Sequence, residues 1–221
     1  MTELPSVEHS YGSELIRKGI HLSSLAIPVV YYFLNKGTAL TILVPLTAVF
    51  LITDILRLFH TPSGRLFEQV FGFLLRAHER NDRGRQLTGA SYVLLSATLS
   101  VLIFPKVIAL TSFAILIISD SAAALIGRKY GRHPFMRKSA EGTTTFFLTA
   151  LIVVALAPKI NYLPQEYVIG GVAALIGTIV EAMSVDIDDN VSIPFSIGAA
   201  MWLLYSVFLP ALNIFKLDNL T

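Results

Sequence analysis

The sequence contains no cysteine, a single tryptophan and few charged side chains. Among its 221 residues, 14% are Asp, Glu, Lys or Arg, whereas a soluble domain usually carries about 25%. Without cysteine, neither a disulfide framework nor a thiolate ligand or nucleophile can form. The formal net charge at pH 7 is +2, which is too small to indicate a nucleic-acid partner. The composition therefore excludes a disulfide-stabilised secreted domain, a thiol enzyme and a typical soluble globule.

The sequence is rich in apolar side chains. Apolar residues make up 54% of the chain and the mean hydropathy is +0.66, which excludes an intrinsically disordered protein. No internal repeat and no low-complexity linker divides the chain. We therefore predict a single integral membrane domain over residues 1–221.

The apolar residues form long stretches. A transmembrane helix needs about 20 mainly apolar residues to cross a hydrocarbon core of about 30 Å. We therefore predict an all-α polytopic membrane protein with about seven transmembrane helices. No basic segment precedes the first stretch, so we expect no cleavable signal peptide. The predicted spans are residues 15–34, 38–59, 87–104, 107–127, 143–157, 167–185 and 193–209.

One segment between the second and third spans is amphipathic rather than apolar throughout. In residues 63–80, six apolar side chains recur at helical spacing, with polar side chains between them. This pattern is typical of an interfacial helix that lies along the membrane surface. A helix packed against the other spans would give the same pattern. The apolar positions are Leu66, Phe67, Val70, Phe71, Leu74 and Leu75.

The basic residues are distributed unevenly between the two sides of a seven-span topology. Only Lys36, Lys106, Lys159 and Lys216 would lie on one side, and all other Lys and Arg residues on the other. Cytoplasmic loops carry the excess of Lys and Arg. We therefore predict a multi-pass protein of the cell (inner or plasma) membrane, with its N-terminus and its richly basic side in the cytoplasm.

Asp120 is an acidic residue inside an apolar stretch. A carboxylate at the centre of a membrane helix costs about 2.5–3.5 kcal/mol on insertion scales, so it normally serves a site or a partner. A carboxylate that reaches the interface and pairs with a neighbouring Arg is the alternative explanation.

A basic, glycine-containing loop follows Asp120. Glycine lets the backbone approach a ligand closely, Lys and Arg bind phosphate, and a hydroxyl at the start of a helix completes an anion site. A basic cytoplasmic loop that only sets topology is the alternative, and the loop lacks the Walker A spacing. The candidate phosphate-binding residues are Gly127, Arg128, Gly131, Arg132, Lys138, Ser139, Gly142 and Thr143.

Two further polar groups lie on the same predicted side. Carboxylates and an Asn after the sixth span are oxygen ligands suited to Mg²⁺ held jointly with substrate phosphates, although a solvated acidic turn also explains Asp186. Arg17, Lys18 and His21 stand at the entry of the first span, where the histidine could transfer a proton or be an ordinary polar residue. The candidate metal ligands are Asp120, Glu181, Asp188, Asp189 and Asn190.

These groups combine cations for phosphates, carboxylates for a metal and a buried Asp at one membrane face. This combination indicates phosphoryl or nucleotidyl transfer between a nucleotide from the cytosol and a lipid from the bilayer. Phosphoryl transfer depends mostly on positioning and charge neutralisation, which such residues supply.

At these residues the sequence resembles the CTP-dependent lipid-alcohol kinases, which include dolichol kinase, phytol kinase and the yeast-type diacylglycerol kinase. The resemblance implies CTP as co-substrate, Mg²⁺ as cofactor and a phytol- or polyprenol-like isoprenoid alcohol as acceptor. We assign catalytic roles to Asp120, Lys18 and His21, with Arg17 closing the nucleotide site. The matching blocks are Arg17-Lys18-x-x-His21, Asp120-x6-Gly127-Arg128-x-x-Gly131, Lys138-Ser139-x-x-Gly142-Thr143, and Glu181 followed by Asp188-Asp189-Asn190-x-x-x-Pro194.

Two other functions are compatible with parts of this pattern. The middle blocks also resemble phosphatidate cytidylyltransferase, but the later Pro-Gly-His-Gly-Gly signature of that enzyme is missing, which favours the kinase. The second alternative is not an enzyme: an ion-coupled transporter would use Asp120 and Glu181 to bind its ion.

Overall fold

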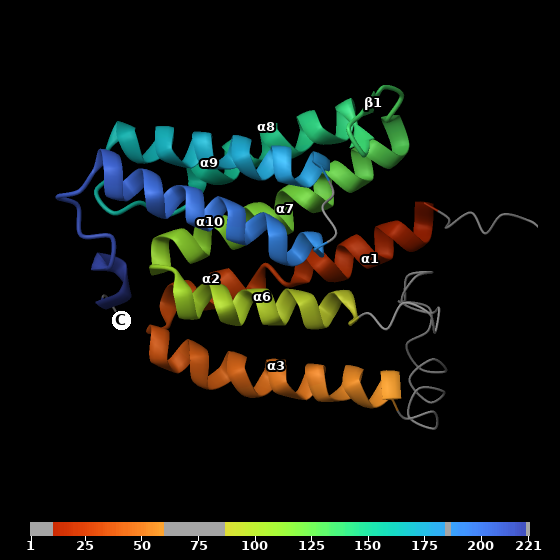
Figure 1. Cartoon of the computed structure of the whole chain (residues 1–221), viewed down its shortest axis with the longest axis horizontal. Coiled ribbons are helices and arrows are strands. Elements are labelled where there is room, and N and C mark those ends of the chain that lie inside the picture. The colour runs from red at the N-terminus through yellow and green to blue at the C-terminus, as the bar shows by residue number, and fades with distance from the viewer. Residues whose placement is uncertain (1–10, 60–86, 184–186, 220–221) are drawn as a thin grey trace, which may run out of the picture.

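The computed structural model describes residues 11–59, 87–183 and 187–219, which form a bundle of helices with one short hairpin (Figure 1). The amphipathic segment 63–80 lies outside the described residues, as does Asp186. The helices are α1 (Tyr11–Ser23), α2 (Ala26–Phe33), α3 (Lys36–Phe59), α6 (Gly89–Ile103), α7 (Lys106–Tyr130), α8 (Ala140–Leu156), α9 (Pro164–Met183) and α10 (Asp189–Phe208), with the strands β1 (Pro134–Phe135) and β2 (Lys138–Ser139) and a terminal 3₁₀ helix, η1 (Lys216–Asn219).

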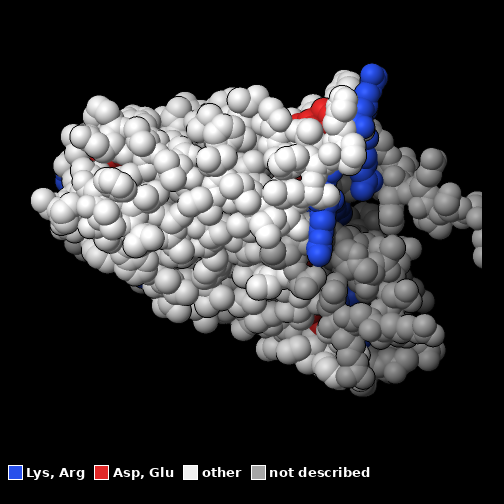
Figure 2. All heavy atoms as spheres, turned by 45° about the horizontal axis from the view of Figure 1, so that its top comes forward, with Lys and Arg blue, Asp and Glu red and all other residues white. Residues whose placement is uncertain are grey.

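The all-α membrane class is confirmed. Four helices, α3, α7, α9 and α10, are long and apolar enough to cross a membrane, while α6 and α8 are apolar but shorter. On the face that Figure 2 shows, the surface along the bundle is almost free of charge, and most of the visible Lys and Arg atoms lie at one end. The total of seven spans stays a prediction, because α6, α8 and the first apolar stretch do not reach spanning length as single helices.

The first apolar stretch is divided into α1 and α2 by a break at Ser24 and Leu25. Pro28 explains the position of the break. Proline has no backbone N–H, and its ring clashes with the carbonyl group four residues earlier, which here belongs to Ser24. The Ser24 carbonyl instead accepts a tighter bond from the N–H of Ile27, at 2.9 Å.

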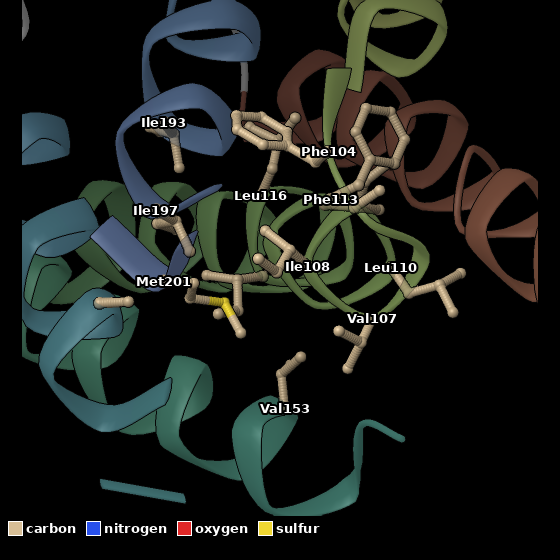
Figure 3. Packing of buried hydrophobic residues seen from close by; sticks show 14 of the residues in the cluster. Phe104, Val107, Ile108, Leu110, Phe113, Leu116, Val153, Ile193, Ile197 and Met201 are labelled. Atoms are coloured by element: carbon tan, nitrogen blue, oxygen red, sulfur yellow. The ribbon is translucent and has the colours of Figure 1, made fainter. Parts of the chain in front are cut away.

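Helix α7 is the centre of the bundle. In its most apolar 18-residue window 72% of the residues are buried, against 22% in α3, which packs on α6 at the edge of the bundle (Figure 1). Figure 3 shows side chains of α7 between those of α8 and α10, for example Ile108 near Met201. A helix buried on all sides in this way is hydrophobic all round, as the sequence of α7 is.

Small residues let α9 lie close to its neighbours. A Cβ atom added at Gly170 would come within 2.6 Å of Val154 Cγ1 on α8, and one added at Gly177 within 2.5 Å of Ile197 Cδ1 on α10. Larger side chains would therefore push these helices apart. The small-residue face of α9 is used for packing within the chain.

The two ends of the bundle differ in their charged residues. One end, which we call the far end, contains the start of α7, the loop from α8 to α9 and η1. Lysine side chains there donate hydrogen bonds to neighbouring oxygen atoms. Lys106 Nζ donates to the carbonyl oxygen of Leu34 at 2.8 Å, and Lys216 Nζ to Asn161 Oδ1 at 2.8 Å. The opposite end, which we call the basic end, contains the hairpin, the last turn of α7 and the first turns of α8 and α10.

Asp54 is a second buried acidic residue, in α3, and its role is structural. Its Oδ2 atom accepts hydrogen bonds from the backbone N–H of Thr88 at 2.7 Å and from Thr88 Oγ1 at 2.9 Å, and Arg57 pairs with Oδ1 at 3.3 Å. Thr88 is the N-cap of α6. Asp54 therefore joins α3 to the start of α6, so its burial needs no catalytic explanation.

Candidate functional site

Asp120 lies at the contact between α7 and α1 at the basic end. The Nζ atom of Lys18 is 2.5 Å from Asp120 Oδ2, and His21 Nε2 is 3.5 Å from the same oxygen. Lys18 and His21 are three residues apart on α1, so both face α7. The side chains of Lys18 and Asp120 are 5% and 14% exposed, so each charge is largely removed from water and neutralised by the other.

A second charged group forms around Lys138 of β2. Its Nζ atom lies 3.2 Å from Glu181 Oε1 on α9 and 3.1 Å from Asp189 Oδ2 at the start of α10. Burial lowers the pKa of Lys138, but the charges of Asp189 and Glu181 oppose this and raise its pKa above the ordinary lysine value. Lys138 therefore stays cationic at neutral pH.

The two groups are close enough to interact. The charge of Asp120 contributes to the raised pKa of Lys138, so the Lys18–His21–Asp120 group and the Lys138–Glu181–Asp189 group belong to one electrostatic environment. We call these six residues the charged cluster. It joins residues from α1, α7, β2, α9 and α10, which are widely separated in the sequence.

The hairpin places Lys138 in this cluster. Strands β1 and β2 are antiparallel and are joined by a turn at Met136 and Arg137, in which Met136 has a left-handed backbone with a φ of 50°. The N–H of Arg137 donates to the carbonyl oxygen of Ala182 at 3.2 Å. This bond ties the turn to the end of α9, next to Glu181.

The glycines of the basic loop lie where α7 crosses α8. A Cβ atom at Gly127 would be 3.3 Å from Gly142 Cα, and one at Gly142 would be 3.2 Å from the carbonyl oxygen of Ala123. A Cβ atom at Gly131 would be 2.7 Å from Ser139 Oγ. Helix packing therefore explains glycine at all three positions without a ligand.

The hydroxyl residues lie at the start of α8. Ser139 is its N-cap, and its Oγ accepts a hydrogen bond from the N–H of Gly142 at 3.2 Å. Thr143 Oγ1 is buried and has no hydrogen-bond partner among the described residues. Ser139 thus serves the helix, while Thr143 retains a hydroxyl that could bind a ligand.

The candidate arginines lie at the same end of the bundle as the charged cluster. Arg128 and Arg132 are exposed at the basic end, and Arg17 is half-buried on α1 beside Lys18. Exposed guanidinium groups remain accessible to an incoming polyphosphate.

The predicted metal ligands do not form a single cage. Asp188 is the N-cap of α10, and its Oδ1 accepts from the backbone N–H and the Nδ2 group of Asn190, at 2.9 and 2.7 Å. In the described part of the chain, no three His, Asp or Glu side chains come together in an arrangement that could hold a metal ion. Glu181 Oε2 is nevertheless buried without a hydrogen-bond partner among the described atoms.

This donor set still fits Mg²⁺ bound together with a nucleotide. Magnesium is usually held by one or two carboxylates, with water and substrate phosphates as the other ligands. Glu181 and Asp189 provide two adjacent carboxylates, and both are paired with Lys138. Asp188 and Asn190 are hydrogen-bonded to each other at the start of α10.

Glu166 was not among the candidate residues selected from the sequence, although it has the most buried carboxylate at the far end. Its carboxylate accepts from the N–H groups of Ile160 at 2.7 Å, Asn161 at 3.0 Å and Leu163 at 3.0 Å, and from Tyr205 Oη at 3.3 Å. An acidic residue in the first turn of a helix is ordinary in a sequence. The only signal was its position beside a loop that contains an asparagine and a proline.

Comparison with known proteins identifies relatives. No protein-family model and no solved structure matches the chain. An uncharacterized protein of Rickettsia prowazekii is 32% identical over 182 residues, which are 81% of this chain and 89% of that protein. A protein named as a probable phytol kinase of Glycine max is 30% identical over 54% of this chain.

A third relative, the CTP-dependent diacylglycerol kinase 1 of Schizosaccharomyces pombe, is 26% identical over 68% of this chain and 74% of its own length. The chain spans only 46% of the Glycine max protein. None of these three names is that of a cytidylyltransferase. The chain belongs to the family of the Rickettsia protein, and the probable phytol kinase and the CTP-dependent diacylglycerol kinase are its more distant relatives.

Proposed function

We propose that this protein is a membrane lipid kinase that transfers the γ-phosphoryl group of CTP to the hydroxyl of an isoprenoid alcohol. The observation that carries the proposal is the charged cluster, which joins two lysines, a histidine and three carboxylates at one end of an apolar bundle. The names of the distant relatives add phytol as a model acceptor and CTP as a model donor.

In the proposed reaction, the hydroxyl oxygen of the alcohol forms a bond to the γ-phosphorus of CTP. The bond from that phosphorus to the oxygen bridging the β- and γ-phosphates breaks, and CDP leaves. The hydroxyl proton passes to a carboxylate or to water. Because the transition state is loose, the enzyme mainly positions the two substrates and neutralises charge.

Asp120 is the residue proposed to face the lipid hydroxyl. Its ion pair with Lys18 at 2.5 Å stabilises the anionic form, which makes the carboxylate a weak base but a good acceptor for a hydroxyl hydrogen bond. A weak base suffices when proton removal lags behind phosphoryl transfer. Lys18 and His21 then hold Asp120 in place and balance its charge.

Lys138 is the residue proposed to bind the triphosphate, with Arg17, Arg128 and Arg132 around it. Glu181 and Asp189 would hold Mg²⁺, which supplies neutralisation of the phosphate charge when bound. Both carboxylates are paired with Lys138, so an arriving triphosphate competes with them for the ammonium group. Transfer of Lys138 from the carboxylates to the phosphates leaves Glu181 and Asp189 available to a cation.

The proposal is tested by product analysis with purified protein in detergent or lipid nanodiscs. Labelled CTP and ATP are each offered with phytol, geranylgeraniol, dolichol or diacylglycerol in the presence of Mg²⁺. We expect a lipid monophosphate and CDP, with CTP preferred. In a parallel reaction with phosphatidate as the acceptor, a CDP-lipid with pyrophosphate would instead show a cytidylyltransferase, and ion-dependent flux without nucleotide turnover would show a transporter.

The excess of basic residues supports a cytoplasmic location for the basic end. A cysteine that replaces His133 should react with a membrane-impermeant maleimide only from the cytoplasm, and one that replaces Pro164 only from outside. Both positions are exposed. Lys106 is unsuitable for this test, because it is 2% exposed and bound to the Leu34 carbonyl. Labelling of position 133 from outside would place the charged cluster away from cytosolic CTP and refute the proposal.

Lys138→Ala should raise the KM for CTP by about tenfold and also lower turnover. The variant removes a cation from the triphosphate site and leaves the charges of Glu181 and Asp189 uncompensated, so both changes oppose nucleotide binding. Steady-state kinetics with varied CTP measure the effect. An unchanged KM for CTP in Lys138→Ala would refute the role of this lysine.

A further inference from the structure

An apolar groove runs along the bundle between α2, α7 and α8, outside the charged cluster. It has a volume of about 420 Å³, which lies within the range of about 300–1,000 Å³ usual for ligand sites. Its floor on α7 is formed by Leu110, Ala114 and Ile118, which follow one another at helical spacing. Its walls come from Leu25, Pro28, Val29, Tyr32 and Phe33 on one side and from Val153, Leu156, Ala157, Pro158 and Tyr162 on the other.

The groove is elongated and open to the lipid side. Leu110 and Ile118 are eight residues apart on α7, which corresponds to about 12 Å along a helix axis. Val29, Phe33 and Leu156 on its rims are among the exposed large apolar residues. A long hydrocarbon chain could therefore enter sideways from the bilayer without crossing a polar surface.

The groove continues from the charged cluster. Lys18 and His21 lie near the end of α1, and Leu25, Pro28 and Tyr32 of the groove wall follow them along the chain, across the break between α1 and α2; on α7, Ile118 of the groove lies two residues before Asp120. One wall of the groove thus begins beside Asp120. An amphiphile lying along this wall would place its polar end at Asp120 and its apolar chain in the groove.

The far end of the groove is formed by Tyr162, whose backbone is held in a left-handed conformation with a φ of 57°. Such a conformation costs about 1–3 kcal/mol and persists only where the surroundings enforce it. The backbone N–H groups of Asn161 and Leu163, on either side of Tyr162, donate to Oε1 of Glu166 and so enforce it here. The backbone at this end of the groove is therefore held in place, while the side chain of Tyr162 is 65% exposed.

From these observations we infer that the groove binds the hydrocarbon chain of the acceptor lipid, with the lipid hydroxyl next to Asp120. The identity of the occupant rests on the proposed kinase activity. The groove wall that begins beside the charged cluster favours an amphiphile over a second copy of the chain.

The test uses the full-length protein in nanodiscs with a long-chain isoprenoid alcohol that carries a diazirine near its tail end. After irradiation, we expect cross-links in peptides that contain residues 25–33, 110–118 and 153–162, and competition by the unmodified alcohol. Ala157→Trp fills the groove and should reduce this labelling at least fivefold. The matched control is Ala155→Trp, which places the same side chain at an exposed position on α8 and should leave labelling unchanged.

Each outcome decides between explanations. Labelling spread evenly over the bundle, α3 included, and insensitive to Ala157→Trp would overturn the inference in favour of ordinary surrounding lipid. A change of oligomeric state in Ala157→Trp would overturn it in favour of a second copy of the chain. The labelling experiment requires no turnover, so its result is independent of the kinase assay. Cross-links specific to the groove without phosphoryl transfer would refute only the proposed kinase activity. Phosphoryl transfer without cross-links in the groove would refute only the inference that the groove binds the lipid chain. If Ala157→Trp fails to fold, competition in the wild-type protein still decides.

Discussion

Asp120→Asn should lower phosphoryl transfer by at least about two orders of magnitude, within the range that a positioned acid or base contributes. The substitution keeps the size of the side chain and its capacity for hydrogen bonds, but it removes the negative charge. An amide neither accepts a proton at neutral pH nor binds a cation well, so both candidate roles of Asp120 are lost. An assay in membranes with CTP, Mg²⁺ and the acceptor alcohol identified by product analysis measures the effect.

The ion pair with Lys18 requires a control for folding. Loss of the charge makes membrane insertion of α7 easier. It also leaves the ammonium group of Lys18, whose side chain is 5% exposed, without its carboxylate partner. Such an unpaired buried charge destabilises a protein. The double variant Asp120→Asn with Lys18→Met removes both charges. It should regain thermal stability in detergent and remain inactive.

Lys129→Ala is the matched loop control. Lys129 is exposed near the end of α7, where it lies over the ring of Tyr130, and it is outside the residues that match the kinases. Its kinetics should be nearly those of the wild type. Near-normal activity in Asp120→Asn would disprove the role of Asp120, and equal losses in Asp120→Asn, Lys138→Ala and Lys129→Ala would mean that the loop charges act only on topology.

Glu166→Ala should destabilise the protein more than any other single substitution at the far end. Three backbone N–H groups and the hydroxyl of Tyr205 donate to this carboxylate, which is fully buried. Each buried donor left without an acceptor costs about 1–3 kcal/mol, out of a total stability of about 5–15 kcal/mol. We expect a fall of about 10 °C or more in the melting temperature in detergent.

Two variants show whether this effect is local. Gln165→Ala changes the exposed neighbour and should leave the melting temperature unchanged, while Glu166→Gln keeps one acceptor oxygen and should have an intermediate effect. The fraction of Glu166→Ala that remains folded should keep the KM for CTP of the wild type, since Glu166 lies at the end opposite the charged cluster. A wild-type melting temperature in Glu166→Ala would show that the loop is held by other contacts.

Hydrophobic patterning determined the class of this protein and the positions of most helices. Helix α7 covers Lys106–Tyr130 where the sequence predicts residues 107–127, and α9 covers Pro164–Met183 against a predicted 167–185. These agreements have a local cause, because a run of apolar residues in a membrane forms a helix in order to satisfy its own backbone hydrogen bonds. The break between α1 and α2 also has a local cause, because Pro28 alone accounts for it.

The residues of the candidate site could be selected from the sequence because charge inside an apolar chain is expensive wherever the chain folds. Asp120, Glu181 and Lys138 stood out for this reason. The same criterion could not separate a site from a structural contact. It passed over Asp54 and Glu166, whose costs are met by the backbone N–H groups of Thr88 and of the loop before α9. Asp188 and Asn190, which we selected as oxygen ligands, also form the cap of α10.

Only the tertiary structure decided which charges meet. The pairing of Lys18 with Asp120 spans 102 residues and that of Lys138 with Asp189 spans 51, and both depend on which helices α7, α8 and α9 pack against. That packing is set by side-chain shape, as at Gly127 and Gly142 where α7 crosses α8, and shape complementarity leaves no periodic signal. The sequence by itself thus determined a helical membrane protein with a basic end and a set of candidate residues. The tertiary structure decided their partners, because ion pairing depends on distances between segments, whereas hydrophobic periodicity depends on neighbours along the chain.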